Sequence, residues 1–132
     1  AVDWIKEREF TNNKHIVVYG ISKGAELALL AASKNSNIKG VVAMAPTSHV
    51  LEGYGTKKQS SSWSQNGQEL PFVPSSTGVK RLMKSLFNSK DKYCNKDMVQ
   101  AIEKYEKKGK TEALIKVENI KGPILLLSGD HD

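Results

Sequence analysis

The chain has 132 residues, of which 39% are hydrophobic and 26% charged. This is an ordinary globular composition, and the length predicts at most one domain. No apolar run approaches the ~20 residues of a membrane-spanning helix, so we expect no membrane partner. The net charge of +6 comes mostly from lysine. Without interleaved aromatic residues or a nucleic-acid motif, this charge indicates a solvated surface or attraction to an anionic substrate, and we expect no nucleic-acid partner.

The beginning of the chain and its single cysteine bear on context. Residues 2–9 have the pattern of the end of a helix, and no initiator Met or signal peptide precedes them. We therefore expect a piece of a longer protein. Cys94 cannot form an internal disulfide, which suits a reducing compartment, and we expect a cytoplasmic location.

A buried strand and a helix are predicted next. Residues 15–19 predict a strand, because 16–19 are apolar and rich in β-branched side chains, and a continuous apolar run favours burial on both faces. Residues 23–34 consist mostly of strong helix formers. Within them Leu27, Leu30 and Ala31 have the spacing of a stripe that faces the core.

The remaining elements follow in chain order. Residues 38–45 predict a second buried strand, and 47–78 show no sustained period, which in a compact domain is typical of a functional or disordered segment. Residues 79–93 and 96–108 predict two helices. Residues 122–129 predict a third buried strand.

Strands that alternate with helices predict right-handed crossovers and a parallel sheet, so the fold class is α/β. Such sheets are covered by helices on both faces and react at the carboxyl ends of their strands. The segments to inspect are therefore those that follow the strands: residues 20–22, 46–49 and 130–132.

The segment Gly20-Ile21-Ser22-Lys23-Gly24 is a G-x-S-x-G between a predicted strand and a predicted helix. In that context it predicts a sharp, strained turn that exposes the Ser22 hydroxyl, with glycines where Cβ atoms would collide. The backbone N–H of Lys23 is a candidate oxyanion donor. A helix-capping role for Ser22 is the alternative. We expect Glu26 to be an ordinary charge in the first helical turn.

A nucleophilic serine needs a histidine base that a carboxylate orients, and in this fold the order along the chain is serine, acid, histidine. Asp132 is the favoured acid and Asp130 the alternative, because both follow the third strand. The histidines present fit poorly. His15 opens a strand at the wrong end, His131 adjoins the acid, and a structural role is more typical for His49. We expect the base to lie beyond residue 132.

Three stretches resemble the acyl-CoA thioesterase and bile acid-CoA:amino acid N-acyltransferase family, in its C-terminal α/β-hydrolase domain. Residues 20–29 resemble its nucleophile elbow, where Lys23 and Glu26 are more specific than the glycines. Residues 61–71 resemble its segment after the next strand, and 115–129 its approach to the acid. The resemblance spans nearly the whole chain.

This resemblance implies a Ser-Asp-His hydrolase of acyl-CoA thioesters, with Ser22 as nucleophile and Asp132 as acid, and without a metal or cofactor. Members that are N-acyltransferases carry cysteine at the nucleophile position, so serine favours hydrolysis. The chain ends before the histidine and lacks the strands before the elbow. We therefore expect residues 1–132 to be a partial α/β-hydrolase domain, nearly inert alone, that self-associates through exposed sheet edges.

Two other interpretations stay open. The same elbow serves carboxylesterases, dienelactone-hydrolase-like enzymes and peptidases, because fold does not fix substrate. Alternatively, the chain is an inactive, truncated remnant of such an enzyme.

Overall fold

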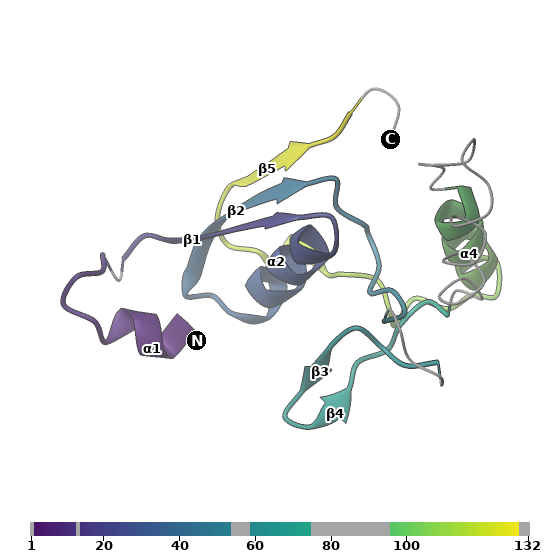
Figure 1. The fold of residues 1–132 in the computed structure, drawn as a ribbon, viewed down its shortest axis with the longest axis horizontal. Helices are drawn as coiled ribbons and strands as arrows, with labels where there is room; N and C mark the ends of the chain where they lie inside the picture. Colours follow the sequence, from purple (N-terminus) through teal and green to yellow (C-terminus); the bar gives the residue numbers. More distant parts are fainter. Residues whose placement is uncertain (1, 13, 54–58, 75–95, 130–132) are drawn as a thin grey trace, which may run out of the picture. The chain divides into compact units, whose positions relative to one another are not determined.

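The computed structural model describes residues 2–12, 14–53, 59–74 and 96–129. The chain divides into two compact units. Figure 1 shows the elements of both, coloured by residue number. Unit 1 spans residues 1–48 and 115–131, and unit 2 spans residues 49–114 with residue 132. The predicted helix over 79–93 and Cys94 lie outside the described residues.

Unit 1 contains the short helix α1 (Val2–Lys6), strand β1 (Ile16–Ile21), helix α2 (Lys23–Lys34), strand β2 (Ile38–Met44), the 3-10 turn η1 (Val117–Asn119) and strand β5 (Ile124–Leu127). The predicted helix over 23–34 is confirmed with the same bounds. The three predicted strands are also confirmed as strands, with most ends shifted by one or two residues. Their predicted burial is wrong for β1, which is exposed on one face, and for β5, of which all four residues are exposed. Among the described helices, α2 covers one face of β1 and β2. The helix predicted over 2–9 is shorter than expected.

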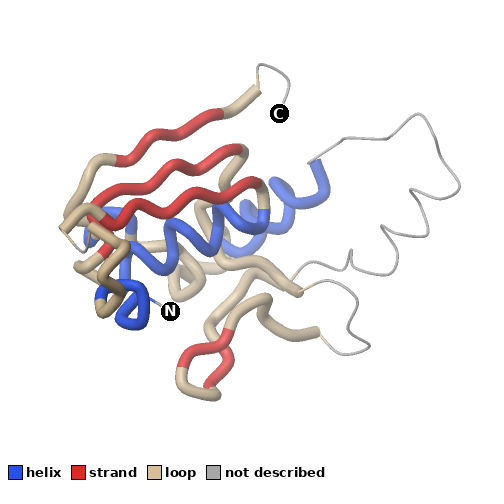
Figure 2. Tube along the Cα trace, turned by 60° about the vertical axis from the view of Figure 1, so that its left-hand side comes forward, coloured by secondary structure: helices blue, strands red, loops and turns tan. Residues whose placement is uncertain are grey.

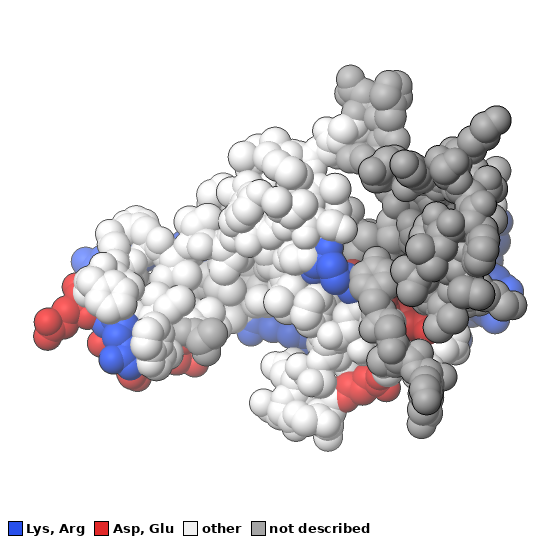
Figure 3. Space-filling model, in the orientation of Figure 1, with Lys and Arg blue, Asp and Glu red and all other residues white. Residues whose placement is uncertain are grey.

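The three strands of unit 1 form a parallel sheet in the order β1-β2-β5, which confirms the predicted α/β class. Helix α2 packs along one face of the sheet, against β1 and β2 (Figure 2). On the other face, side chains that alternate along the strands are exposed in the described structure. They are Val17, Tyr19, Ile21, Met44, Leu125 and Leu127. In the view of Figure 3 few charged side chains lie over the sheet, and several gather around α1.

The face of α2 that meets the sheet differs from the predicted stripe. Leu27 is 40% exposed, so its assignment to the core is wrong, and Ala31 is only half-buried. Leu30 is buried as predicted. The buried face instead contains Ala25, Ala28, Leu29 and Ala32. Small alanine side chains let the helix approach the sheet closely, and this decides which of the possible apolar stripes faces inward.

Unit 2 contains a hairpin of β3 (Ser64–Gln65) and β4 (Gln68–Glu69), and helix α4 (Lys96–Glu106). The two hairpin turn residues, Asn66 and Gly67, have φ of 52° and 77°. Positive φ at both positions is what a tight two-residue hairpin requires, and Asn-Gly is its preferred sequence. The sequence therefore carried a turn signal inside the segment 47–78 that we interpreted as irregular.

The core of unit 2 joins α4 to the segments on either side of the hairpin. Leu51, Val73, Tyr105 and Ala113 form a buried cluster, and one face of α4 packs against it. Helix α4 ends two residues before the predicted bound. Gly109 follows it with φ of 70°, and its N–H donates to the carbonyl of Glu106. This is a left-handed stop of the kind that ends many helices.

The β1–α2 turn depends on a close approach between Gly20 and Gly24. A Cβ added at Gly20 would lie 2.6 Å from the backbone nitrogen of Ala25 and still closer to the carbonyl group of Gly24. All of these are backbone atoms, which cannot move without shifting α2. At Gly24, by contrast, an added Cβ has no described atom within 4 Å. The prediction that a Cβ atom would collide at both glycines is therefore confirmed for Gly20 and wrong for Gly24.

These two glycines give a matched pair of variants. We expect Gly20→Ala to destabilise unit 1 by about 3 kcal/mol or more, because the new methyl group overlaps backbone. Gly24→Ala should be neutral or stabilise by up to about 1 kcal/mol, because alanine is the better helix former. Urea unfolding of both variants measures the difference. Equal stability of the two would contradict the close approach.

Candidate active site

Ser22 lies between the end of β1 and the start of α2, with φ of 50° and ψ of −115°. Such a conformation costs a non-glycine residue about 1–3 kcal/mol and persists only where the surroundings enforce it. The side chain makes no capping hydrogen bond to α2, and the residue is exposed. Ser22 thus occupies the N-cap position of α2 without using its hydroxyl as a cap, and the strained turn that the G-x-S-x-G pattern predicts is present.

Hydrogen bonds hold the backbone of Ser22 on both sides. Its N–H donates to the carbonyl of Met44 at 2.8 Å, which continues the β1–β2 ladder into the turn. Its carbonyl accepts from the N–H groups of Ala25 and Glu26, at 3.0 and 3.1 Å. Ser22 is thus fixed to the end of β2 and to the first turn of α2. The helix N-terminus also brings positive potential to this position.

A second left-handed residue lies at the same edge of the sheet. Ala45 follows β2 directly and has φ of 47°, and its N–H donates to the carbonyl of Leu127 at 2.7 Å. This bond ties the carboxyl end of β2 to that of β5, as the Ser22 bond ties β1 to β2. The carboxyl ends of all three strands are therefore linked in one row.

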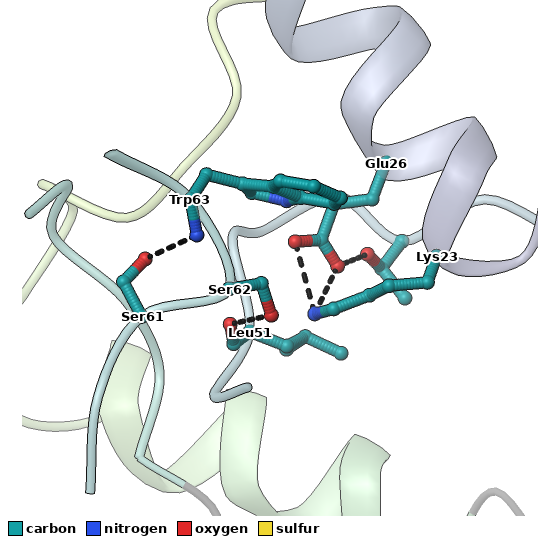
Figure 4. Close-up of polar contacts among 7 residues, drawn as sticks. Lys23, Glu26, Leu51, Ser61, Ser62 and Trp63 are labelled. Carbon is teal, nitrogen blue, oxygen red and sulfur yellow. Dashed lines mark hydrogen bonds and ion pairs between the residues drawn. The ribbon is translucent and has the colours of Figure 1, made fainter. Parts of the chain in front are cut away.

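Glu26 is completely buried, at 0% exposure. The Lys23 ammonium donates to its two carboxylate oxygens at 3.1 and 2.9 Å, as Figure 4 shows, and the Thr47 hydroxyl donates to Oε2 at 3.1 Å. Glu26 lies in the first turn of α2 as expected, but its burial was not expected. The carboxylate can be buried because a cation and a hydroxyl replace its water.

Sequence reasoning placed Lys23 at this site for its backbone N–H and missed Thr47. The signal that was available is the place of Thr47 in the segment 46–49, which follows the predicted second strand and was marked for inspection without a role for this residue. Lys23 and Glu26 have i, i+3 spacing on α2, which favours an ion pair. Nothing in that spacing indicates burial, and one hydrogen-bond partner of the buried carboxylate lies 21 positions away.

Trp63, near the hairpin in unit 2, is half-buried. Its backbone N–H donates to Oγ of Ser61 at 3.2 Å, and its backbone carbonyl accepts from the N–H of Leu70. The nearby Ser62 hydroxyl donates to the Leu51 carbonyl (Figure 4). The backbone of this loop is thus held by several hydrogen bonds within unit 2.

The expected acids, Asp132 and Asp130, lie outside the described residues together with His131. What the structure describes is the strand that leads to them. Strand β5 ends at Leu127, beside the end of β2 and at the same sheet edge as Ser22. The segment after β5 thus leaves the sheet from the edge where an acid partner would be required.

The two described histidines differ in their surroundings. His15 is exposed and precedes β1, at the amino end of that strand. His49 is buried in unit 2, with Nε2 3.6 Å from Glu106 Oε1 and its ring edge-to-face with Tyr105. Burial lowers the pKa of His49, and the nearby Glu106 carboxylate opposes this only in part.

The described part of the chain shows neither a metal-ligand cluster nor a membrane-spanning helix. Within it, no three His, Cys, Asp or Glu side chains gather as metal ligands would. Among the helices that the structure describes, none combines the length and apolar character needed to cross a bilayer.

Comparison with known proteins gives one match. Residues 1–132 match the family model described as "BAAT / Acyl-CoA thioester hydrolase C terminal". A search of curated proteins and a search of solved structures found no match.

Because Ser22 has a positive φ, we expect a glycine variant at this position to be more stable than an alanine variant, the reverse of the order inside a helix. Ser22→Gly should be more stable than Ser22→Ala by about 1 kcal/mol, because only glycine adopts this φ without strain. At Ser33, inside α2, the order should reverse, with alanine better by about 0.5–1 kcal/mol. Urea midpoints of the four variants test this, and the same order at both sites would refute the strain.

Burial of His49 predicts acid sensitivity in unit 2. The folded-state pKa lies below the ordinary 6.5, so the unfolded chain takes up the proton first as the pH falls. Stability should therefore be full above about pH 6.5 and decline below it, by at most about 1.4 kcal/mol per pH unit, until the folded-state pKa is passed. Urea unfolding at pH 7 and pH 5 should show this decline reduced in His49→Gln and retained in His15→Gln. An identical decline in all three proteins would disprove this origin.

Proposed function

The chain belongs to the BAAT / acyl-CoA thioester hydrolase C-terminal family, and from that premise we propose that it is a serine hydrolase of acyl-CoA thioesters. The family description indicates activity of the thioester hydrolase or acyltransferase type. In the proposed enzyme Ser22 is the nucleophile, and residues 1–132 form part of an α/β-hydrolase domain.

The observation that carries this proposal is the conformation of Ser22. An exposed serine at φ 50° and ψ −115°, between a parallel strand and a helix, has the geometry that a nucleophile elbow requires. A serine retained only for structure would relieve this strain by becoming glycine, or would use its hydroxyl to cap α2. It does neither, which supports a requirement for the hydroxyl itself.

The proposed chemistry has two steps. A histidine base takes the Ser22 proton as Oγ bonds to the thioester carbonyl carbon, and the N–H of Lys23 donates to the oxyanion. The C–S bond then breaks, and coenzyme A leaves as a thiol with that proton. In the second step the same base activates water, which attacks the acyl-serine ester, releases the carboxylic acid and restores Ser22.

The acid and the base that act with Ser22 are assigned from the chain order serine, acid, histidine. We assign the acid to Asp132, with Asp130 as the alternative, because both follow the strand β5 that ends at the reactive edge. The base is a histidine other than His15, His49 or His131, since the first precedes β1, the second is buried in unit 2 and the third adjoins the acid.

Hydrolysis is favoured over acyl transfer by the nucleophile. In the family that the sequence resembles, the N-acyltransferases carry cysteine at the nucleophile position. This chain has serine there, at position 22. The net charge of +6 adds a general attraction for the phosphates of an acyl-CoA.

The test uses the protein at full length, with a fluorophosphonate probe and a series of acyl-CoA and simple ester substrates. We expect stoichiometric labelling and preferential turnover of acyl-CoA, and loss of both in Ser22→Ala by at least ~10³-fold. Ser33→Ala is the control, because it removes a serine inside α2, away from the turn that Ser22 occupies.

Each adverse result removes a different part of the proposal. Labelling that persists in Ser22→Ala would eliminate Ser22 as nucleophile. Efficient cleavage of simple esters without cleavage of acyl-CoA would instead indicate a carboxylesterase on the same fold. A full-length protein that reacts with neither the probe nor any substrate would indicate an inactive remnant.

A further inference from the structure

The proposed mechanism leaves one buried charged group of unit 1 without a function. The side chain of Glu26 is only 1% exposed, in the first turn of the helix that begins directly after Ser22. A buried carboxylate is costly unless cations and hydrogen-bond donors surround it, so a plain apolar residue would be the simpler way to fill this position.

The Glu26 carboxylate connects two segments that meet at Ser22. On one side it holds the ammonium group of Lys23, the residue whose backbone N–H is the proposed oxyanion donor. On the other side it accepts from the hydroxyl of Thr47. Thr47 lies three residues beyond Met44, whose carbonyl accepts the Ser22 N–H.

This connection runs parallel to the backbone bonds that fix Ser22. Main-chain bonds tie Ser22 to the end of β2 and to the first turn of α2, and the Glu26 side chain ties the first turn of α2 to the segment that follows β2. Left-handed backbone persists where the surrounding structure over-determines it. The buried Glu26 carboxylate, with its half-buried partners Lys23 and Thr47, supplies such a constraint next to two strained residues, Ser22 and Ala45.

We propose that Glu26 is a positioning residue of the active site, which holds the Ser22 turn and the Lys23 N–H in their reactive geometry through its bonds to Lys23 and Thr47. The role rests on the proposed function of Ser22. It requires no contact between Glu26 and substrate. A displacement of about 1 Å at a reacting group can cost ~10²-fold in rate, so this role predicts a kinetic effect beyond stability.

The test measures the second-order rate constant for fluorophosphonate labelling of the full-length protein, with kcat and KM for acyl-CoA and the melting temperature. Glu26→Gln keeps the shape and removes the charge that holds Lys23. Thr47→Val removes only the hydroxyl, and Thr47→Ser retains it. Glu118→Gln is the matched control, because Glu118 is also a first-turn acid, in η1, and is exposed.

The rates are measured at a temperature well below the melting temperature of each variant. There we expect Glu26→Gln to lower the labelling rate constant and kcat by roughly 10–100-fold, with little change in KM. Thr47→Val should lower the same two rate constants by roughly 10-fold, and in Thr47→Ser they should stay within about 2-fold of the parent values. Glu118→Gln should match the parent.

A merely structural role predicts a different result. In that case Glu26→Gln and Thr47→Val would lower the melting temperature and the fraction of molecules labelled, while the rate constant of the folded fraction stayed at the parent value, and the positioning role would be overturned. Should Glu26→Gln fail to fold, the Thr47→Val and Thr47→Ser pair decides alone. Absence of Ser22-dependent labelling in the parent protein would overturn the proposed function itself, and this role with it.

Discussion

The site in unit 1 depends on one steric constraint, the contact of the Gly20 α-carbon with the backbone of Gly24 and Ala25. Because this approach leaves no room for a side chain, β1 can turn into α2 within a single residue. That residue, Ser22, takes the strain as a left-handed φ, and its hydroxyl remains exposed. Main-chain bonds to Met44, Ala25 and Glu26 then hold the turn. Without the close approach, none of this geometry would exist.

The fold of unit 1 was largely predictable because its signals are local. A continuous β-branched run, a run of helix formers and G-x-S-x-G between them predict β1, the turn and α2 without information from distant residues. The parallel order of the strands follows from the alternation of strand and helix. The position of Ser22 in the turn was predictable for the same reason, whereas its catalytic role and its acid partner stay predictions.

Features that depend on distant residues were not predictable. The buried Glu26 carboxylate accepts a hydrogen bond from Thr47, which follows another strand, and no spacing rule relates the two positions. Which side of α2 faces the sheet was misjudged at Leu27, because the alanine face allows a closer approach than the leucine spacing suggested. The hairpin was missed for a different reason. Its strands have two polar residues each, too few for alternation to appear, and only Asn66-Gly67 marked the turn.

The apolar sheet face that bears Val17, Tyr19 and Leu125 has a calorimetric consequence. Unfolding raises the heat capacity in proportion to the apolar surface that is newly hydrated, and these side chains already contact solvent in the described structure. Residues 1–132 in isolation would therefore unfold with a heat capacity increment below the typical value of about 12–15 cal/mol/K per residue. Their stability would vary less steeply with temperature than that of a domain with both sheet faces covered.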